Sequence, residues 1–108
     1  MITVNDVKKV SLAFIKTYKN VYNNKSLRDS FLKKYTGDDS TFEKKYCISV
    51  DLVAKAVAKH LGVDCKKIEK LLINSTTNNL PKVKYDVDVK GSYRSKKYNH
   101  YYYLGDVK

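Results

Sequence analysis

The residues whose types best suit chemistry in this sequence are tyrosines set among positive charges close to its C-terminus. Aromatic rings stack on unpaired nucleic-acid bases for about 1 to 3 kcal/mol per base, while neighbouring cations pair with phosphates. In a β-strand, Tyr101 and Tyr103 share one face and Tyr102 takes the other, so some rings must pack in the core. The alternative is that these rings serve packing alone. The candidates for a single-strand surface are Tyr93, Arg94, Lys96, Lys97, Tyr98, Tyr101, Tyr102 and Tyr103.

A second group of cations lies in the segment 64–74, outside the apolar stripe that its spacing predicts. These cations are Lys66, Lys67 and Lys70, and the later Lys84 and Lys90 extend the set. Lysines give affinity for phosphates with little sequence information. The segment has no Arg or Gln to read base edges, and Asn74 comes only at its end. The pattern favours nucleic-acid binding without sharp duplex specificity, and a solvated lysine face is the alternative.

Little in the sequence indicates catalysis or a cofactor. The motifs for a Gly-rich phosphate loop, an activated nucleophile and a metalloprotease are absent. His60 falls within a helical apolar stripe, where we expect a buried imidazole, and Asp86 with Asp88 reads as a solvated strand face. The remaining metal-ligand types lack the close spacing of a zinc site: Cys47, His60, Cys65 and His100. We therefore expect a non-enzyme without catalytic residues, metal or cofactor.

Charge and length limit the class of protein. The 108 residues fit one domain, 1–108, and 22 Lys and Arg against 11 Asp and Glu give a net charge of +11. This balance favours a polyanionic partner, although codon bias in an AT-rich genome also enriches Lys, Asn and Tyr. The start has no apolar run typical of a secretory signal, and no stretch approaches the roughly 18 apolar residues of a membrane span. The expectation is a cytoplasmic protein with reduced thiols and no membrane partner.

The N-terminal half is predicted to be helical. Apolar residues recur at intervals of three and four from Val4 to Val21, which indicates an amphipathic helix. Ser26, with Asp29 three residues on, resembles a capping box that opens a shorter helix ending at Gly37. The polar stretch 38–45 reads as a loop, and "YCI" reads as one short strand.

The segment 49–74 has the pattern of two helices joined by a tight turn. Ser49 can cap the first helix, Gly62 supplies a left-handed turn, and Asp64 can cap the second helix. After Pro81, "KVKYDVDVK" alternates with the period of a half-buried strand, and "YNHYYYL" follows a basic turn. The predicted fold class is α+β, a helical core with a C-terminal β-hairpin.

This arrangement resembles the winged helix-turn-helix family, with the helix-turn-helix at about 49–74 and the wing at about 82–104. The resemblance implies that the helix 64–74 enters the major groove and that the hairpin tip touches backbone or minor groove. Size, tyrosine density and Lys-rich, Asn-rich composition also resemble the small single-strand-binding winged-helix proteins encoded beside replication genes on staphylococcal cassette chromosomes. That narrower resemblance implies service in the DNA replication of a mobile genetic element.

Three functions remain open at this stage. The first is a single-stranded DNA-binding protein, which would accompany a replicative helicase or polymerase. The second is a duplex-binding transcriptional regulator, which would usually need a dimer to reach two half-sites. The sequence shows no obvious long dimerisation helix beyond the first one, where Phe14 and Ile15 are the candidates for that contact. The third is a protein-interaction module, such as a phage inhibitor or a replisome adaptor, whose exposed tyrosines anchor a partner.

Overall fold

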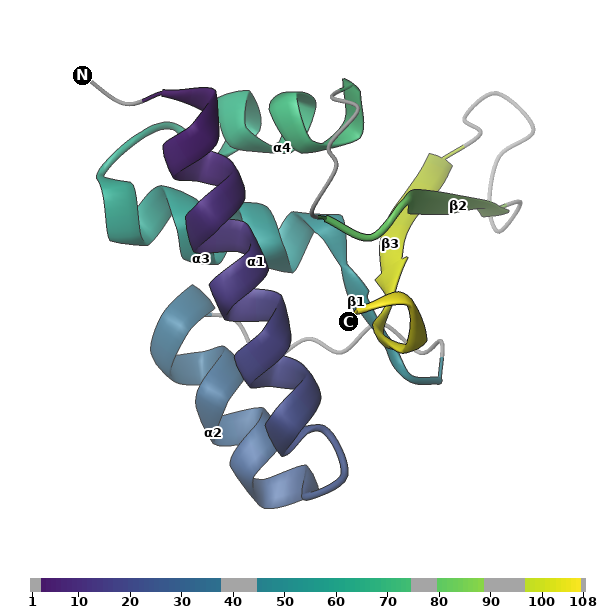
Figure 1. Cartoon of the computed structure of the whole chain (residues 1–108). Coiled ribbons are helices and arrows are strands. Elements are labelled where there is room, and N and C mark those ends of the chain that lie inside the picture. Colours follow the sequence, from purple (N-terminus) through teal and green to yellow (C-terminus); the bar gives the residue numbers. More distant parts are fainter. Residues whose placement is uncertain (1–2, 38–44, 75–79, 89–96, 108) are drawn as a thin grey trace.

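The computed structural model describes residues 3–37, 45–74, 80–88 and 97–107, with the backbone alone for 86–88 and 97–99. Over these ranges four α-helices accompany a three-stranded antiparallel sheet, so the α+β class is confirmed (Figure 1). Their layout is compatible with that of a winged helix. The helices are α1 (Val4–Val21), α2 (Lys25–Thr36), α3 (Val50–Leu61) and α4 (Cys65–Asn74). The strands are β1 (Cys47–Ser49), β2 (Val83–Asp88) and β3 (Lys97–Tyr103), and a 3-10 turn, Leu104–Asp106, follows β3.

The first two helices begin at local caps. At the start of α1, the Asp6 backbone N–H donates to Thr3 Oγ1 at 3.2 Å, and the Thr3 N–H donates to the Asp6 carboxylate at 3.0 Å. The predicted cap at Ser26 is wrong, because Asn24 Oδ1 accepts the Leu27 N–H at 3.1 Å and α2 already begins at Lys25. Asn caps a helix as well as Ser does, and here it stands first in the chain. Gly37 ends α2 as predicted.

The two helices and the tight turn predicted for 49–74 are confirmed at both caps and at the turn. Ser49 Oγ accepts the Asp51 N–H at 3.1 Å, and Asp64 Oδ1 accepts the Lys66 N–H at 3.2 Å. Gly62 has φ 70°, a left-handed conformation that disfavours a side chain. Helix α3 packs against α1, α2, α4, β1 and β3, so it forms the centre of the fold.

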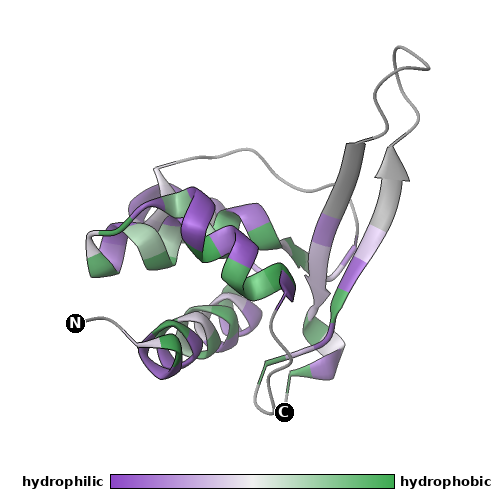
Figure 2. Ribbon diagram, turned by 90° about the horizontal axis from the view of Figure 1, so that it is seen from above, coloured by the Kyte–Doolittle hydropathy of each residue, from purple (hydrophilic) through white to green (hydrophobic). Residues whose placement is uncertain are grey.

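The strand order in the sheet is β1-β3-β2, with β3 in the middle. Strand β1 pairs only with Tyr101–Tyr103, whereas β2 pairs with β3 from Val83↔Tyr102 out to Asp88↔Lys97. The hairpin of β2 and β3 is therefore two-stranded beyond Tyr101, and it projects away from the helices (Figure 2). The short strand predicted from "YCI" is confirmed as β1, which begins at Cys47.

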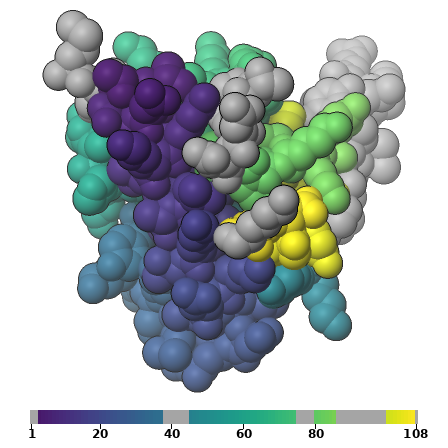
Figure 3. Space-filling model, viewed as in Figure 1, coloured from purple at the N-terminus to yellow at the C-terminus, as the bar shows by residue number. Residues whose placement is uncertain are grey.

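Apolar side chains of α1, α2, α3, α4 and the sheet form one core, and α1 covers one face of it (Figure 3). Phe14 and Ile15 of α1 were expected to serve a dimer interface if the protein bound duplex DNA. They are 8% and 0% exposed within a single chain, so this expectation is wrong. No helix in the described ranges has both the length and the apolar character needed to cross a membrane.

Candidate nucleic-acid interface

The outer face of α4 carries the predicted lysines. Ile68 and Leu72 are buried at 3% and 2% exposure and hold the inner face of α4 in the core. The three predicted lysines of this helix are all exposed, and over the described residues none of them forms an ion pair. Their charges therefore stay available to a polyanion. These residues are Lys66, Lys67 and Lys70.

Asn74 joins two of these lysines on one surface. Lys67, Lys70 and Asn74, together with Leu71, follow the i, i+3, i+4, i+7 spacing of one helix face. They line a shallow hollow of about 390 Å³. The sequence placed Asn74 merely at the end of the helix, whereas the periodicity of α4 brings its amide beside two cations. The C-terminal end of α4 points toward the hairpin (Figure 1).

Tyr85 is the most exposed large hydrophobic side chain of the described residues, at 62%. Its ring centroid lies 6.0 Å from that of its cross-strand partner, His100. The alternation of "KVKYDVDVK" predicts that Tyr85 shares the half-buried face of its strand with the valines, so the sequence does not mark Tyr85 as a site residue. The sequence did contain a signal for the exposure of Tyr85. The predicted strand "YCI" is much shorter than "KVKYDVDVK", so it can cover only the base of the hairpin.

Two of the tyrosines predicted to bind are buried. Tyr102 is 0% exposed, because it lies between Ile48 of β1 and Val83 of β2 on the side that faces the core. Tyr101 is 6% exposed on the opposite side of the sheet. Neither ring offers a face to a base, and both are therefore removed from the candidate surface. Burial raises the pKa of the Tyr102 hydroxyl, because the phenolate would lose its water.

Tyr103 keeps a partly exposed ring, at 39%, beside a predicted cation. Lys84 Nζ lies 5.2 Å from the centroid of this ring and 3.7 Å from Asp106 Oδ2. The edge of the ring meets Tyr46, with centroids 5.9 Å apart. Lys84 therefore shares its charge with a carboxylate and a ring, and both contacts fix its position at the base of the hairpin.

The remaining predicted residues divide into two groups. Lys90, Tyr93, Arg94 and Lys96 lie outside the described residues. For Lys97 and Tyr98, the first two residues of β3, the structure gives backbone register. The candidate surface thus consists of the α4 lysines with Asn74 and of Tyr85 on the hairpin, whereas Lys84, which pairs with Tyr101, lies on the opposite face of the hairpin.

His60 and Cys65, two of the metal-ligand types in the sequence, are both placed by the structure. His60 is exposed, so the expected buried imidazole is wrong: in the last turn of α3, Ala58 and Leu61 pack against the core and His60 lies outside that stripe. Burial, followed by the nearby carboxylate of Asp51, raises the pKa of the Cys65 thiol, which disfavours the reactive thiolate. Among the residues placed in the structure, no three His, Cys, Asp or Glu side chains gather to hold a metal ion.

Comparison of the chain with protein-family models, with curated proteins and with solved structures gives no match in any of the three. The functional assignment therefore depends on the geometry and charge of the chain itself.

Proposed function

We propose that this chain is a non-catalytic DNA-binding domain of the winged helix-turn-helix type that prefers single strands. The order of elements supports the fold assignment: α3, a glycine turn and α4 are followed by a hairpin that pairs with the short strand β1 before α3. In such domains the second helix of the turn and the hairpin are the elements that contact nucleic acid.

The observation that carries the preference for single strands is the exposure of Tyr85 on a hairpin that extends past the helices. A duplex hides the faces of its bases, whereas a single strand exposes them to an aromatic ring. The neighbouring His100 ring supports the position of Tyr85 from the paired strand. Tyr85 thus replaces Tyr101 and Tyr102 as the proposed stacking residue.

The lysines of α4 are proposed to hold the phosphate backbone. Lys67 and Lys70 lie on one face of a helix that points toward the hairpin, and the whole chain carries a net charge of +11. A strand bound across both elements pairs phosphates with α4 and stacks a base at the hairpin. Service in the replication of a mobile element, beside a helicase or polymerase, stays a prediction from the resemblance.

The experiment that tests this function is fluorescence anisotropy of a labelled dT oligomer and of a random duplex, each at two salt concentrations. The expected result is tighter binding of the single strand, by about tenfold or more at the higher salt, since stacking is less sensitive to salt than ion pairing. Equal or tighter duplex binding at both salt concentrations would contradict the preference for single strands.

A duplex-binding regulator is the second candidate, and Asn74 is the observation that favours it. An Asn amide can pair with an adenine edge in the major groove, and here it shares one helix face with Lys67 and Lys70. On this hypothesis Asn74→Ala lowers the affinity for a preferred duplex sequence but not for random duplex. Selection of duplex sequences by the wild-type protein, followed by this comparison, distinguishes the two candidates.

A further inference from the structure

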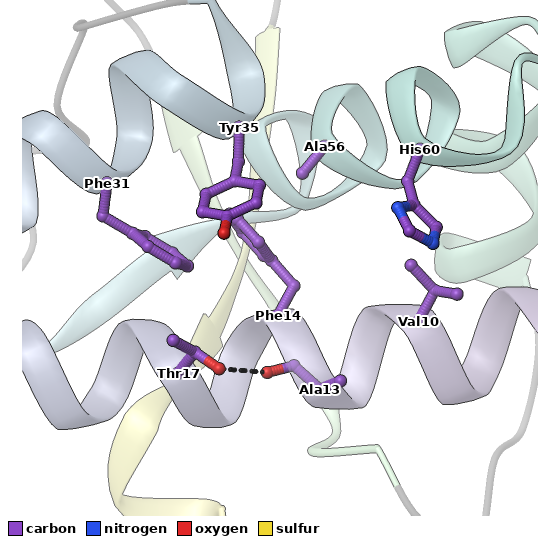
Figure 4. A pocket seen from close by; sticks show the side chains of 8 residues that line it. All are labelled: Val10, Ala13, Phe14, Thr17, Phe31, Tyr35, Ala56 and His60. Carbon is purple, nitrogen blue, oxygen red and sulfur yellow. Dashed lines mark hydrogen bonds between the residues drawn. The ribbon is translucent and has the colours of Figure 1, made fainter.

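A pocket of about 240 Å³ opens between α1, α2 and α3, and its residues are separate from those of the α4 and hairpin surface. Figure 4 shows the side chains that line it. Phe14 and Phe31 stack with their ring centroids 5.0 Å apart. Tyr35, which is 43% exposed, lies 4.8 Å from Phe31, and His60 lies on the opposite side. The pocket is therefore aromatic and open to solvent.

The size of the pocket suits one apolar group. A cavity of about 150 Å³ lined by apolar side chains is sufficient to hold a benzene ring. This pocket is larger, and its walls are mostly carbon. It can accept one aromatic or large aliphatic side chain.

The charged side chains of the three segments that line the pocket are lysines. The lining segments 10–17, 31–35 and 56–60 contain no Asp or Glu, and the acidic residues of α1, α2 and α3 lie outside these segments, at Asp6, Asp29 and Asp51. Lys34 Nζ lies 5.3 Å from the centroid of the Tyr35 ring, and Lys59 Nζ donates to the Lys34 carbonyl at 3.4 Å. The exposed cations of these segments are Lys16, Lys33, Lys34 and Lys59.

We propose that this pocket binds a short acidic segment of a partner protein, which inserts one aromatic or large aliphatic side chain between α1 and α2. The complementarity is twofold. Acidic side chains of the partner pair with the exposed lysines of the lining segments, such as Lys16, Lys34 and Lys59, and the inserted group covers Phe14 and Phe31. Such a combination of a buried anchor with a charged rim is typical of protein interfaces.

A nucleic-acid base fits the pocket less well than an apolar side chain does. A base carries donors and acceptors along its edge, and these need partners when they are buried. The Thr17 hydroxyl already donates to the Ala13 carbonyl at 2.9 Å. The polar side-chain groups left in the lining are the Tyr35 hydroxyl and the His60 imidazole, which are too few for a base edge.

The test is anisotropy of a fluorescein-labelled peptide of aspartates with one phenylalanine, measured against the intact chain. Two matched peptides, one with Phe replaced by Ala and one with each Asp replaced by Asn, should each bind at least tenfold more weakly. Ala13→Leu, which narrows the mouth from the exposed side of α1, should weaken the peptide at least fivefold. Lys16→Glu should weaken it several-fold, while the same charge change at Lys66 on α4 should alter it by less than twofold.

Binding of a dT oligomer to Ala13→Leu distinguishes this pocket from the nucleic-acid surface. An unchanged affinity for the oligomer, with a weakened affinity for the peptide, supports the proposal whether or not single strands are preferred. Three outcomes overturn it: no peptide binding, equal binding of the Phe and Ala peptides, or equal loss of oligomer and peptide in Ala13→Leu. Circular dichroism of Ala13→Leu and the independent Lys16→Glu result guard against a folding defect.

Discussion

Tyr85 and Tyr102 lie on the same face of one hairpin, yet Tyr85 is 62% exposed and Tyr102 is completely buried. The pair of Tyr85 and His100 lies two residues along the hairpin from the pair of Val83 and Tyr102. Tyr102 is covered because β1 pairs with Tyr101–Tyr103 at the base of the hairpin, and this pairing does not reach Tyr85 and His100. One face thus changes from core to candidate binding surface within two residues.

Replacing Tyr85 is expected to weaken single-strand binding. Tyr85→Ala should lower the affinity for a dT oligomer by about 5-fold to 150-fold, which corresponds to the 1 to 3 kcal/mol of one stacked base. Tyr85→Trp should retain it. Tyr35→Ala, which removes another exposed tyrosine from α2, is the matched control and should leave the affinity unchanged. An affinity of Tyr85→Ala equal to that of the wild type would contradict the stacking role.

The lysines of α4 are expected to control the salt dependence. Each phosphate contact adds about 0.7 to the slope of log K against log salt concentration for a single strand. Lys67→Ala and Lys70→Ala should therefore each lower that slope by about 0.7 in a titration series. Lys25→Ala, at the exposed start of α2, serves as the control. A slope that does not change in either α4 variant would remove this helix from the interface.

Removing the Tyr102 hydroxyl is expected to stabilise the fold. Tyr102 Oη is buried and has no hydrogen-bond partner among the described residues. A buried unsatisfied polar group costs about 1 to 3 kcal/mol. Tyr102→Phe should thus raise the free energy of unfolding in urea by about 1 kcal/mol, whereas Tyr103→Phe at the surface should change it little. A loss of stability in Tyr102→Phe would show that the hydroxyl is satisfied.

Stability is expected to fall at alkaline pH because of Tyr18. Burial raises its pKa to about 12 in the folded state, from the ordinary tyrosine value of about 10. Between these values the unfolded chain releases a proton that the folded chain keeps, so stability falls as pH rises, by up to about 1.4 kcal/mol per pH unit. Urea unfolding at pH 9 and pH 11 should show a smaller fall for Tyr18→Phe. An identical fall would assign the effect to other groups.

The turn between α3 and α4 is expected to require glycine. Gly62 has φ 70°, and no atom lies within 4 Å of the position that a Cβ would take, so the penalty is purely conformational. Gly62→Ala should lower the free energy of unfolding by about 1 to 2 kcal/mol. Gly62→Asn should lose less, because Asn tolerates the left-handed region. Equal losses for Ala and Asn, measured by urea denaturation, would argue against this origin.

Local signals in the sequence determined the helices, the turn and the strands. Periodicity gave α1 its bounds, and Ser49, Gly62 and Asp64 marked the helix-turn-helix, because caps and left-handed turns depend on residues close in sequence. Alternation also predicted that Tyr102 and its neighbours divide between two faces. The error at Ser26 arose within the same local rules, since Asn24 caps equally well.

Only the tertiary structure decided which tyrosines are buried and where the surfaces lie. Alternation assigns a residue to a face but not to the covered or the uncovered part of that face, which depends on where β1 and the helices end. The exposure of Tyr85 and His60 and the burial of Tyr102 depend on packing against elements that are distant in the sequence. The pocket likewise combines side chains of three helices, and no local pattern records how those helices pack.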